Sequence, residues 1–293
     1  MAWSSCLSTK SLLFISAASV LLLLPVGSWA QKLDSLNLEY HNGPVLSGKI
    51  DLSILWYGRF ARGQKQVLRQ FIQSLNTKIG NEPQVSKWWN MVEQYQSATP
   101  AEQSDSLSSV GRTLTQQSIQ SLAQKATTGL PSSVALIFTD KNVAVQGTPK
   151  GRCSQHGFVN SGASKTLYMV VGNPEVNCPE CGWPFNKPTS GPHLFQLQPP
   201  NGNVGTDAMV IGLAAALAET VSNPYNTGYF LAGVEAVSAC PKRFGSGAFP
   251  GFAGKIRINP GTGATYNAHG VKRSNFLLPA LWNPKTRSCW TLL

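Results

Sequence analysis

Two short motifs in the middle of the sequence carry residue types that bind metal ions. They are "CSQH", from Cys153 to His156, and "CPEC", from Cys178 to Cys181. Two close pairs of such ligands are typical of a closed tetrahedral zinc site. The alternative is that the cysteines form disulfides and that His156 lies in a turn, which an oxidising compartment favours. "CPEC" also matches a redox pair, but no thioredoxin-like strand surrounds it. We therefore predict disulfides and no bound metal.

The other patterns nominate no catalytic group. No two histidines stand four residues apart, and the sequence contains no "HExxH" zinc-peptidase motif; the four are His41, His156, His193 and His269. A serine–histidine–aspartate arrangement needs no closeness in sequence, but no "GxSxG" elbow singles out a serine. The phrase "GTDAM" has too few glycines for a phosphate-binding loop. We predict no catalytic residue and no cofactor.

The first thirty residues have the composition of a secretory signal peptide. Lys10 precedes an apolar stretch, and "SWA" at residues 28–30 places small residues before a cleavage point. We predict cleavage before Gln31, which leaves one mature domain over residues 31–293. A membrane anchor is the alternative, but the stretch is short and lies at the extreme terminus. No later run approaches ~20 apolar residues, so we expect no membrane span.

The mature chain is basic. Residues 1–30 hold Lys10 and no acidic residue, so the net charge falls from +11 to +10 on cleavage. The basic residues are scattered, without a basic run or an aromatic-basic motif, which argues against nucleic acid as a partner. A basic extracellular protein would instead bind acidic polysaccharide.

Five cysteines remain after cleavage, and an odd number leaves one without a partner in the chain. They are Cys153, Cys178, Cys181, Cys240 and Cys289. We predict a Cys240–Cys289 bridge, because both residues flank Gly- and Pro-rich segments that have little core of their own. This bridge closes about fifty residues and would contribute ~4 kcal/mol. The second predicted bridge joins Cys153 to Cys178 or Cys181.

Tryptophans are the candidate sugar-binding residues. Trp56 and Trp88 are expected in the core, where aromatic side chains bury most of their surface. Trp183 lies in "CGWPFNKP", beside the predicted disulfide cysteines, and is the candidate for an exposed glycan platform.

The segment "GTDAMVIGLAAALAETVSNPYN", residues 205–226, is apolar on all sides, which predicts a buried helix. Pro224 ends the helix because it biases Asn223 away from helical geometry. One carboxylate, Glu219, stands near its far end. We expect Glu219 to accept a hydrogen bond from a nearby backbone N–H or to face a solvent gap, since unpaired burial is costly.

Hydrophobic periodicity predicts a single α/β or α+β domain with a central sheet. Expected strands cover residues 50–58, 132–140 and 165–172, and expected helices cover residues 64–76, 86–96 and 115–127. Ser86 is the expected N-cap of the second helix. The polar stretch "ATPAEQSDSLSS", residues 98–109, is expected to be an exposed loop.

Several phrases, in order from about Leu38 to the C-terminus, resemble one family. They are "YHNGPVLSGKIDLSILWYGRF", "CPECGWPF", "NGNVGTDAMV", "TVSNPYNTGYF", "VEAVSACPKRFGSGAFPGFAGKI" and "NFLLPALWNPKTRSCWTL". This set resembles the plant EXORDIUM-like family, also called phosphate-induced proteins. The "CPEC" loop is one residue shorter than the family's usual form.

The resemblance implies a secreted plant protein of the apoplast and cell wall that promotes growth in brassinosteroid-dependent regulation. No enzymatic activity is established for the family, so the resemblance implies no catalytic residues. A fainter similarity links "AALAETVSNP", "GYF" and "VEAVSAC" to zincin-like secreted proteins reading "HExxE…DP…GW". It would place Ala215 and Ala216 where a metal ligand and a base stand, and implies a zincin-like fold without the metal ligands.

We therefore expect a secreted, non-catalytic growth-promoting protein of the cell wall. The alternatives are a secreted hydrolase acting on wall peptide or glycan, and a polysaccharide-binding module that uses Trp183 and basic loops. The expected partner is an acidic cell-wall polysaccharide or a cell-surface receptor.

Overall fold

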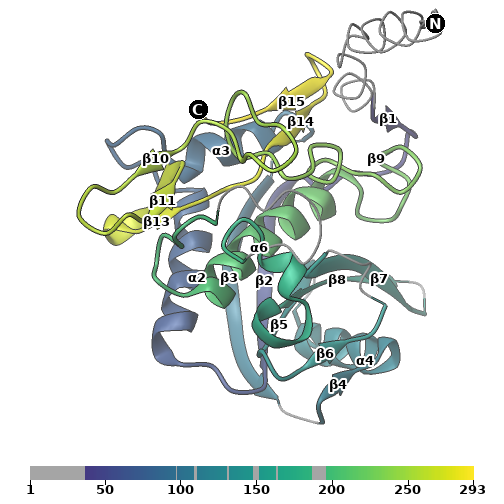
Figure 1. Ribbon diagram of the computed structural model, residues 1–293. Coiled ribbons are helices and arrows are strands. Elements are labelled where there is room, and N and C mark those ends of the chain that lie inside the picture. The colour runs from purple at the N-terminus through teal and green to yellow at the C-terminus, as the bar shows by residue number, and fades with distance from the viewer. Residues whose placement is uncertain are drawn as a thin grey trace, which may run out of the picture. The chain divides into compact units, whose positions relative to one another are not determined.

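Five strands form the central sheet, in the order β3-β2-β5-β8-β7. They are β3 (Ala98–Ser108), β2 (Gly48–Tyr57), β5 (Ser133–Thr139), β8 (Ser164–Gly172) and β7 (Ser154–Ser161). The first four run parallel, and β7 joins the far edge antiparallel to β8 (Figure 1). The sheet confirms the predicted α/β class.

The computed structural model describes residues 37–96, 98–108, 111–130, 132–147, 152–162, 164–186 and 196–293. The predicted signal peptide, residues 1–30, lies outside these residues. Cleavage before Gln31 therefore stays a prediction.

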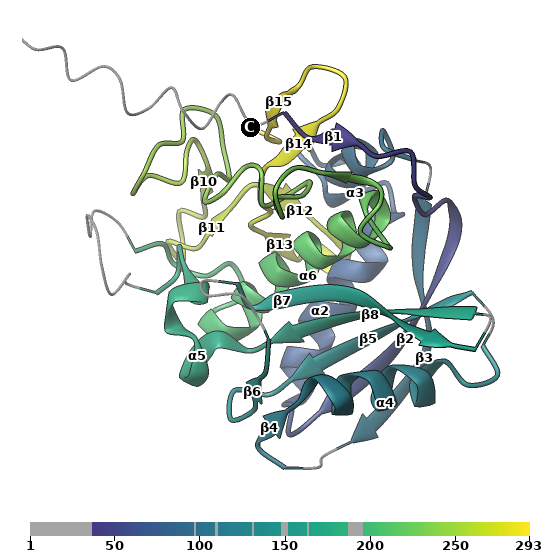
Figure 2. The ribbon, with the colours of Figure 1, turned by 90° about the vertical axis from the view of Figure 1, so that its right-hand side faces the viewer.

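Side chains of the central strands alternate between two cores. Leu136 and Met169 belong to a large core on one face of the sheet, whereas their neighbours Ile137 and Val170 belong to a smaller core on the other face. The large core is covered by α2 (Arg62–Leu75), α3 (Val85–Val92) and α6 (Val204–Ser222), and the small one by α4 (Gln116–Thr127) (Figure 2). Helices on both faces explain why β5 is buried along its whole length.

The three helices predicted at residues 64–76, 86–96 and 115–127 are present as α2, α3 and α4. The cap of α4 is Thr115, whose side chain accepts a hydrogen bond from the Ser118 N–H at 3.1 Å. The predicted cap of α3 is wrong. Gln84 precedes that helix without a side-chain cap bond, and Ser86 lies inside the helix and is buried.

The prediction of an exposed loop at residues 98–109 is also wrong, because β3 is an edge strand there. An edge strand pairs on one side only and keeps polar side chains in water, so its composition resembles that of a loop. Glu102 and Asp105 are exposed on β3, and Arg69 of α2 forms ion pairs with both carboxylates. The opposite edge strand, β7, is likewise polar, and its composition predicted no strand.

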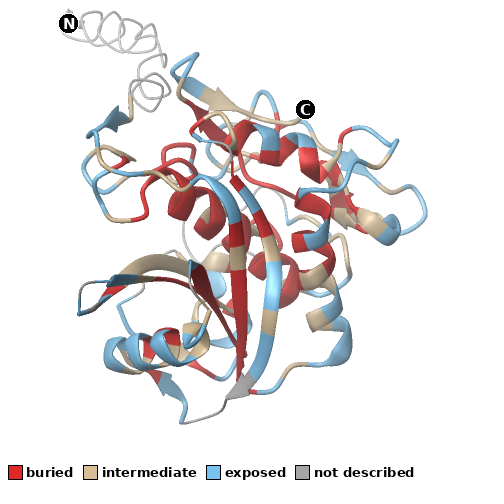
Figure 3. Ribbon diagram, turned by 180° about the vertical axis from the view of Figure 1, so that it is seen from behind, coloured by how far each residue is buried: buried red, intermediate tan, exposed pale blue. Residues whose placement is uncertain are grey.

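Helix α6 is the predicted buried helix and lies across the large core (Figure 3). The Asn203 side chain caps it by accepting a hydrogen bond from Thr206 N–H at 2.8 Å. The helix ends at Asn223, whose φ of −149° is extended, directly before Pro224. Among the described helices, α6 is the one long and apolar enough to cross a membrane, and 83% of its apolar window is buried inside the protein.

The C-terminal segment packs over α3 and α6 in short strand pairs. Trp88 Nε1 donates to the Pro279 carbonyl at 2.8 Å, and the Tyr95 hydroxyl donates to the Trp282 carbonyl. Trp56 and Trp88 are both fully buried, as predicted. The remaining elements are β1 (Glu39–Tyr40), β4 (Thr113–Leu114), β6 (Ala144–Val145), α5 (Pro174–Asn177), η2 (Pro179–Gly182), β9 (Tyr229–Phe230), β10 (Arg257–Ile258), β11 (Thr265–Tyr266), β12 (Ala268–His269), η3 (Val271–Arg273), β13 (Asn275–Phe276), β14 (Leu281–Asn283) and β15 (Ser288–Trp290).

Candidate functional site

One stripe of α6 lines a cavity of about 290 Å³. Its members recur every three or four residues, with one adjacent pair, so they lie on one face of the helix. They are Ala208, Ile211, Gly212, Ala215 and Glu219. The first four are small or apolar, and Glu219 adds a carboxylate at the C-terminal end of the stripe.

The opposite wall comes from the "CPEC" loop and the C-terminal segment. Trp183 packs against Phe244 with ring centroids 5.7 Å apart. The Lys242 ammonium lies 6.0 Å from the centre of the Trp183 ring, within cation–π range. Arg152, just before β7, adds a second cation to the lining. A mostly apolar cavity with a few charged groups is typical of a small-molecule site, although 290 Å³ is at the small end of the range.

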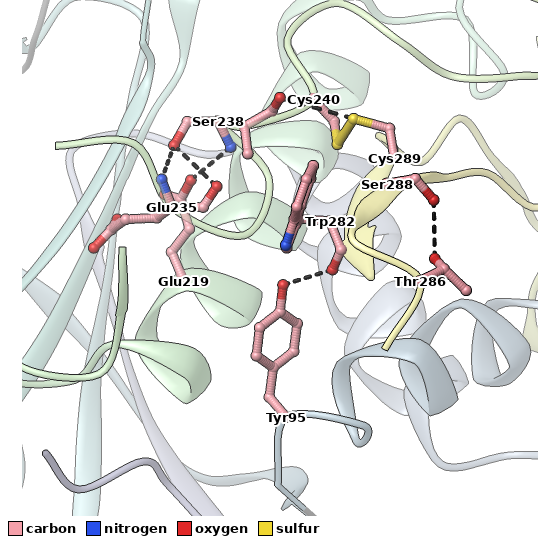
Figure 4. The surroundings of a disulfide bond; sticks show 10 residues. Tyr95, Glu219, Glu235, Ser238, Cys240, Trp282, Thr286, Ser288 and Cys289 are labelled. Carbon is pink, nitrogen blue, oxygen red and sulfur yellow. Dashed lines mark hydrogen bonds between the residues drawn. A yellow bond between two sulfur atoms is a disulfide. The ribbon is translucent and has the colours of Figure 1, made fainter. Parts of the chain in front are cut away.

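The Glu219 carboxylate is nearly fully buried. Its Oε1 accepts a hydrogen bond from Ser238 N–H at 3.0 Å, which is the first of the two arrangements expected for this carboxylate (Figure 4). Its Oε2 lies 3.9 Å from Arg152 Nη1. Burial, followed by the charge of Glu235, raises the pKa of Glu219, and the positive charges and hydrogen bond nearby only partly oppose this.

Glu235 links Glu219 to a buried histidine. His156 Nε2 of β7 lies 2.9 Å from Glu235 Oε2, and Asn223 Nδ2 donates to the other carboxylate oxygen of Glu235. Burial lowers the pKa of His156, but the hydrogen bond and charge of Glu235, together with the charge of Glu219, outweigh burial and the charge of Arg152, so the pKa is raised. Below pH 6.5, the ordinary pKa of histidine, His156 therefore forms an imidazolium–carboxylate ion pair with Glu235.

His156 Nε2 and one oxygen from each of Glu219 and Glu235 all lie within 4.8 Å of one another. One imidazole and two carboxylates are a donor set that zinc accepts. A metal-bound imidazole almost always donates its second N–H to a partner, whereas His156 Nδ1 is buried without a partner among the described residues. The unpartnered Nδ1 is equally unfavourable for an imidazolium, which donates from both ring nitrogens, so the direct 2.9 Å contact between His156 Nε2 and Glu235 Oε2 is what describes this cluster.

The four-ligand zinc site considered for "CSQH" and "CPEC" does not form. The sulfur atoms of Cys153, Cys178 and Cys181 lie within 4.8 Å of one another, but His156 belongs to the glutamate cluster instead. Cys178 and Cys181 are joined by a disulfide, and Cys153 is free. The predicted bridge from Cys153 is therefore wrong. A single 3-10 turn, η2, sets the Cα atoms of Cys178 and Cys181 5.6 Å apart, within disulfide range.

The predicted Cys240–Cys289 bridge is confirmed, with Cα atoms 5.7 Å apart. Figure 4 shows it beside Trp282, between the loop that carries Glu235 and strand β15. Cys240 is buried in a small cluster with Ala239, Ala280 and Trp282. The bridge fixes the loop that presents Ser238 to Glu219.

Trp183 is not the exposed platform that was predicted. It is half-buried, because its ring packs on Phe244 and lines the cavity. Arg152, Glu235 and the pairing of His156 were not predicted from the sequence. His156 and Glu235 are 79 positions apart, so no spacing within one element connects them.

The fold and this site define a mixed α/β protein whose described residues contain two disulfides and a cavity beside a buried ion-pair cluster. The chain belongs to the phosphate-induced protein 1 family, because the family profile "Phosphate-induced protein 1 conserved region" matches residues 38–292.

Curated relatives support the same membership. The chain is 39% identical to "Protein EXORDIUM" of Arabidopsis thaliana over 282 residues, which covers 87% of this chain and 89% of the relative. It is 40% identical to "Protein EXORDIUM-like 2" of Arabidopsis thaliana over 276 residues (88% and 90%) and 39% identical to "Protein PHOSPHATE-INDUCED 1" of Nicotiana tabacum over 285 residues (90% and 90%). No solved structure matches significantly. The zincin-like arrangement therefore stays a prediction.

Proposed function

We propose that this chain is a secreted, non-catalytic protein of the apoplast and cell wall that promotes growth in brassinosteroid-dependent regulation. The observation that carries the proposal is family membership over nearly the whole mature chain, residues 38–292. The signal-peptide composition of residues 1–30 supports secretion. The absence of catalysis is supported by Ala215 and Ala216, which can neither hold a metal nor accept a proton.

The test combines secretion and growth in one plant line that lacks the endogenous protein. The full chain should restore growth and its response to added brassinosteroid, and should be recovered from apoplastic fluid with Gln31 as its first residue. The matched control is a chain without residues 2–30, which should stay inside cells and restore nothing. Equal restoration by both chains would contradict an extracellular role.

A second candidate function is binding of acidic wall polysaccharide in the cavity. Three observations favour it. Trp183 offers an aromatic face to a sugar ring, Lys242 and Arg152 supply positive charge at the same cavity, and the mature chain is basic overall. A ligand that enters the cavity would contact Trp183 directly.

Retention on polygalacturonate, compared with a neutral glucan, tests this second function. We expect retention on the acidic polymer at low salt, with a strong loss for Trp183→Ala. The matched control is Phe249→Ala, which removes an exposed aromatic ring that does not line the cavity. Equal losses for both variants would contradict a role of the cavity. Retention that disappears at high salt and does not depend on Trp183 would show binding by charge alone, which would also contradict that role.

A further inference from the structure

Three cysteine sulfur atoms meet at one point of the fold. Cys178 and Cys181 are bridged, and the free thiol of Cys153 lies beside them, with all three sulfur atoms within 4.8 Å of one another. We propose that these residues form a site of intramolecular thiol–disulfide exchange, in which Cys153 displaces Cys181 and becomes bridged to Cys178.

The backbone holds the attacking thiol in place. The Cys153 carbonyl accepts a hydrogen bond from Gly172 N–H at 2.7 Å, so the chain is tied to the end of β8 just before β7 begins. Cys178 and Cys181 are carried instead on the short η2 turn, in which Cys181 N–H donates to the Cys178 carbonyl at 3.0 Å. A fixed thiol therefore stands next to a bridge on a small, local turn.

Empty space adjoins all three residues. Cys153 and Cys178 line one cavity of about 260 Å³, and Cys153 and Cys181 line the cavity of about 290 Å³ described above. A change of side-chain rotamer at these positions does not have to displace tightly packed atoms, which is what normally opposes such changes in a protein core. The geometry thus allows the sulfur atoms to approach each other.

The exchange is balanced within the chain. Cys153 loses its proton to water, and the resulting thiolate attacks Sγ of Cys178. The Cys153–Cys178 bond forms as the Cys178–Cys181 bond breaks, and the Cys181 thiolate takes up a proton from water. One disulfide replaces another, so no oxidant or reductant is required.

The charges around the two cavities do not by themselves set the direction of exchange. The cavity at Cys181 is lined by Arg152 and Lys242 but also by Glu180 and Glu219, whereas Arg152 is the one charged residue that lines the cavity at Cys178. Cations stabilise a thiolate and carboxylates destabilise it, so the product identified by peptide mapping decides the direction. The product places a new thiol in the wall that also contains Trp183.

The reaction is expected to be slow at neutral pH. Burial raises the pKa of the Cys153 thiol to about 12, so only a small fraction is the reactive thiolate. Below that pKa the thiolate fraction rises about tenfold per pH unit, and the exchange rate should follow it.

Peptide mapping without reduction tests the proposal. The mature protein is incubated without added thiol at several alkaline pH values, quenched in acid, alkylated and digested. We expect a Cys153–Cys178 peptide that accumulates about tenfold faster per pH unit, while the Cys240–Cys289 peptide stays intact as an internal control for folding. A Cys178–Cys181 bridge that persists unchanged at every pH would overturn the proposal. A Cys153–Cys181 product would retain exchange but overturn its direction.

Two variants test whether Cys153 can pair with Cys178 without the alkaline incubation. Cys181→Ser leaves Cys153 and Cys178 as the available pair, so the secreted variant should contain a Cys153–Cys178 bridge and no thiol that can be alkylated. Cys153→Ser should hold the Cys178–Cys181 bridge at every pH. Two free thiols in Cys181→Ser protein that keeps its Cys240–Cys289 bridge would show that the sulfur atoms do not meet.

Discussion

His156 Nε2 lies 2.9 Å from Glu235 Oε2, and both side chains are at least nine-tenths buried. This contact joins the edge strand β7 to the loop that follows β9. Asn223, which terminates α6, donates to the same carboxylate. The His156–Glu235 pair and Asn223 therefore connect strand β7, the C-terminal end of α6 and the loop that follows β9.

Breaking this pair should strongly destabilise the protein. Glu235→Gln removes the charge but keeps the shape, and it leaves the buried His156 imidazolium without its hydrogen-bonded carboxylate. We expect a loss of about 3 kcal/mol in the free energy of unfolding, measured by urea denaturation near pH 6. The control is Glu175→Gln, which breaks the exposed Lys141–Glu175 pair and should cost less than about 1 kcal/mol. Equal effects of the two variants would contradict the structural role of the buried pair.

Stability should fall as the pH rises from acid to neutral. Burial raises the pKa of Asp207 from 3.8 to about 6, and the pKa values of Glu219 and His156 are also raised. Each group then binds its proton more tightly in the folded chain. Its stabilising effect is complete below the unfolded pKa and is lost as the pH passes the folded pKa.

The variant Asp207→Asn isolates one part of this pH profile. Asp207 alone should lower the free energy of unfolding by on the order of 2–3 kcal/mol between about pH 4 and pH 6. In D207N that part of the decline should flatten, whereas the decline above pH 6.5, which His156 contributes, should remain. The free energy of unfolding, measured by urea titration at each pH, checks both regions. An unchanged slope below pH 6 would show that Asp207 does not titrate there.

The buried elements of this fold were predictable, and the edges were not. Strand β5 and helix α6 bury nearly all their residues, so their composition directly reflects their environment. Edge strand β3 is polar because water solvates one side of it, and polar composition alone does not separate an edge strand from a loop.

The site was predictable only where its contacts are local. The backbone partner of Glu219 followed from the cost of burying a carboxylate. The partnership of His156 with Glu235 depends on how β7 passes α6, which no spacing in the sequence encodes. The free state of Cys153 was likewise not predictable. It follows from the Cys178–Cys181 bridge, and the spacing of the cysteines gave no indication that the η2 turn would pair those two residues.

Two neighbouring alanines of α6 should respond differently to enlargement. Ala216 is fully buried in the large core, so Ala216→Leu should overpack it and cost about 1–3 kcal/mol. Ala215 is half-buried and lines the cavity, which has room for a larger side chain. Ala215→Leu should therefore leave the free energy of unfolding within about 1 kcal/mol of the parent. It should also fill the cavity and reduce retention on polygalacturonate. A larger loss for A215L than for A216L would contradict the placement of the cavity.

The two disulfides should contribute unequally to stability. Cys240 and Cys289 are 49 positions apart, and Cys178 and Cys181 are three apart. Loop-closure entropy gives ~4 kcal/mol for the long bridge and ~2 kcal/mol for the short one. The double variant Cys240→Ser/Cys289→Ser should therefore lower the denaturation midpoint about twice as far as Cys178→Ser/Cys181→Ser. A smaller effect of the long bridge would show that the C-terminal segment folds without it.

Glu219→Gln separates a binding protein from a hydrolase. Glu219 is the carboxylate at the cavity whose pKa burial raises, so a hydrolase mechanism in this cavity would use it as the proton donor. The amide of Gln keeps the shape and can still accept the hydrogen bond from Ser238 N–H, but it cannot transfer a proton. If the protein acts without catalysis, E219Q should be secreted normally and restore growth to within about twofold of the parent chain, since binding tolerates the loss of one weak ion pair with Arg152. Growth in the plant line that lacks the endogenous protein is the readout, and the amount of protein in apoplastic fluid is the control for folding. Loss of growth restoration in normally secreted E219Q would favour the hydrolase and reject the non-catalytic role.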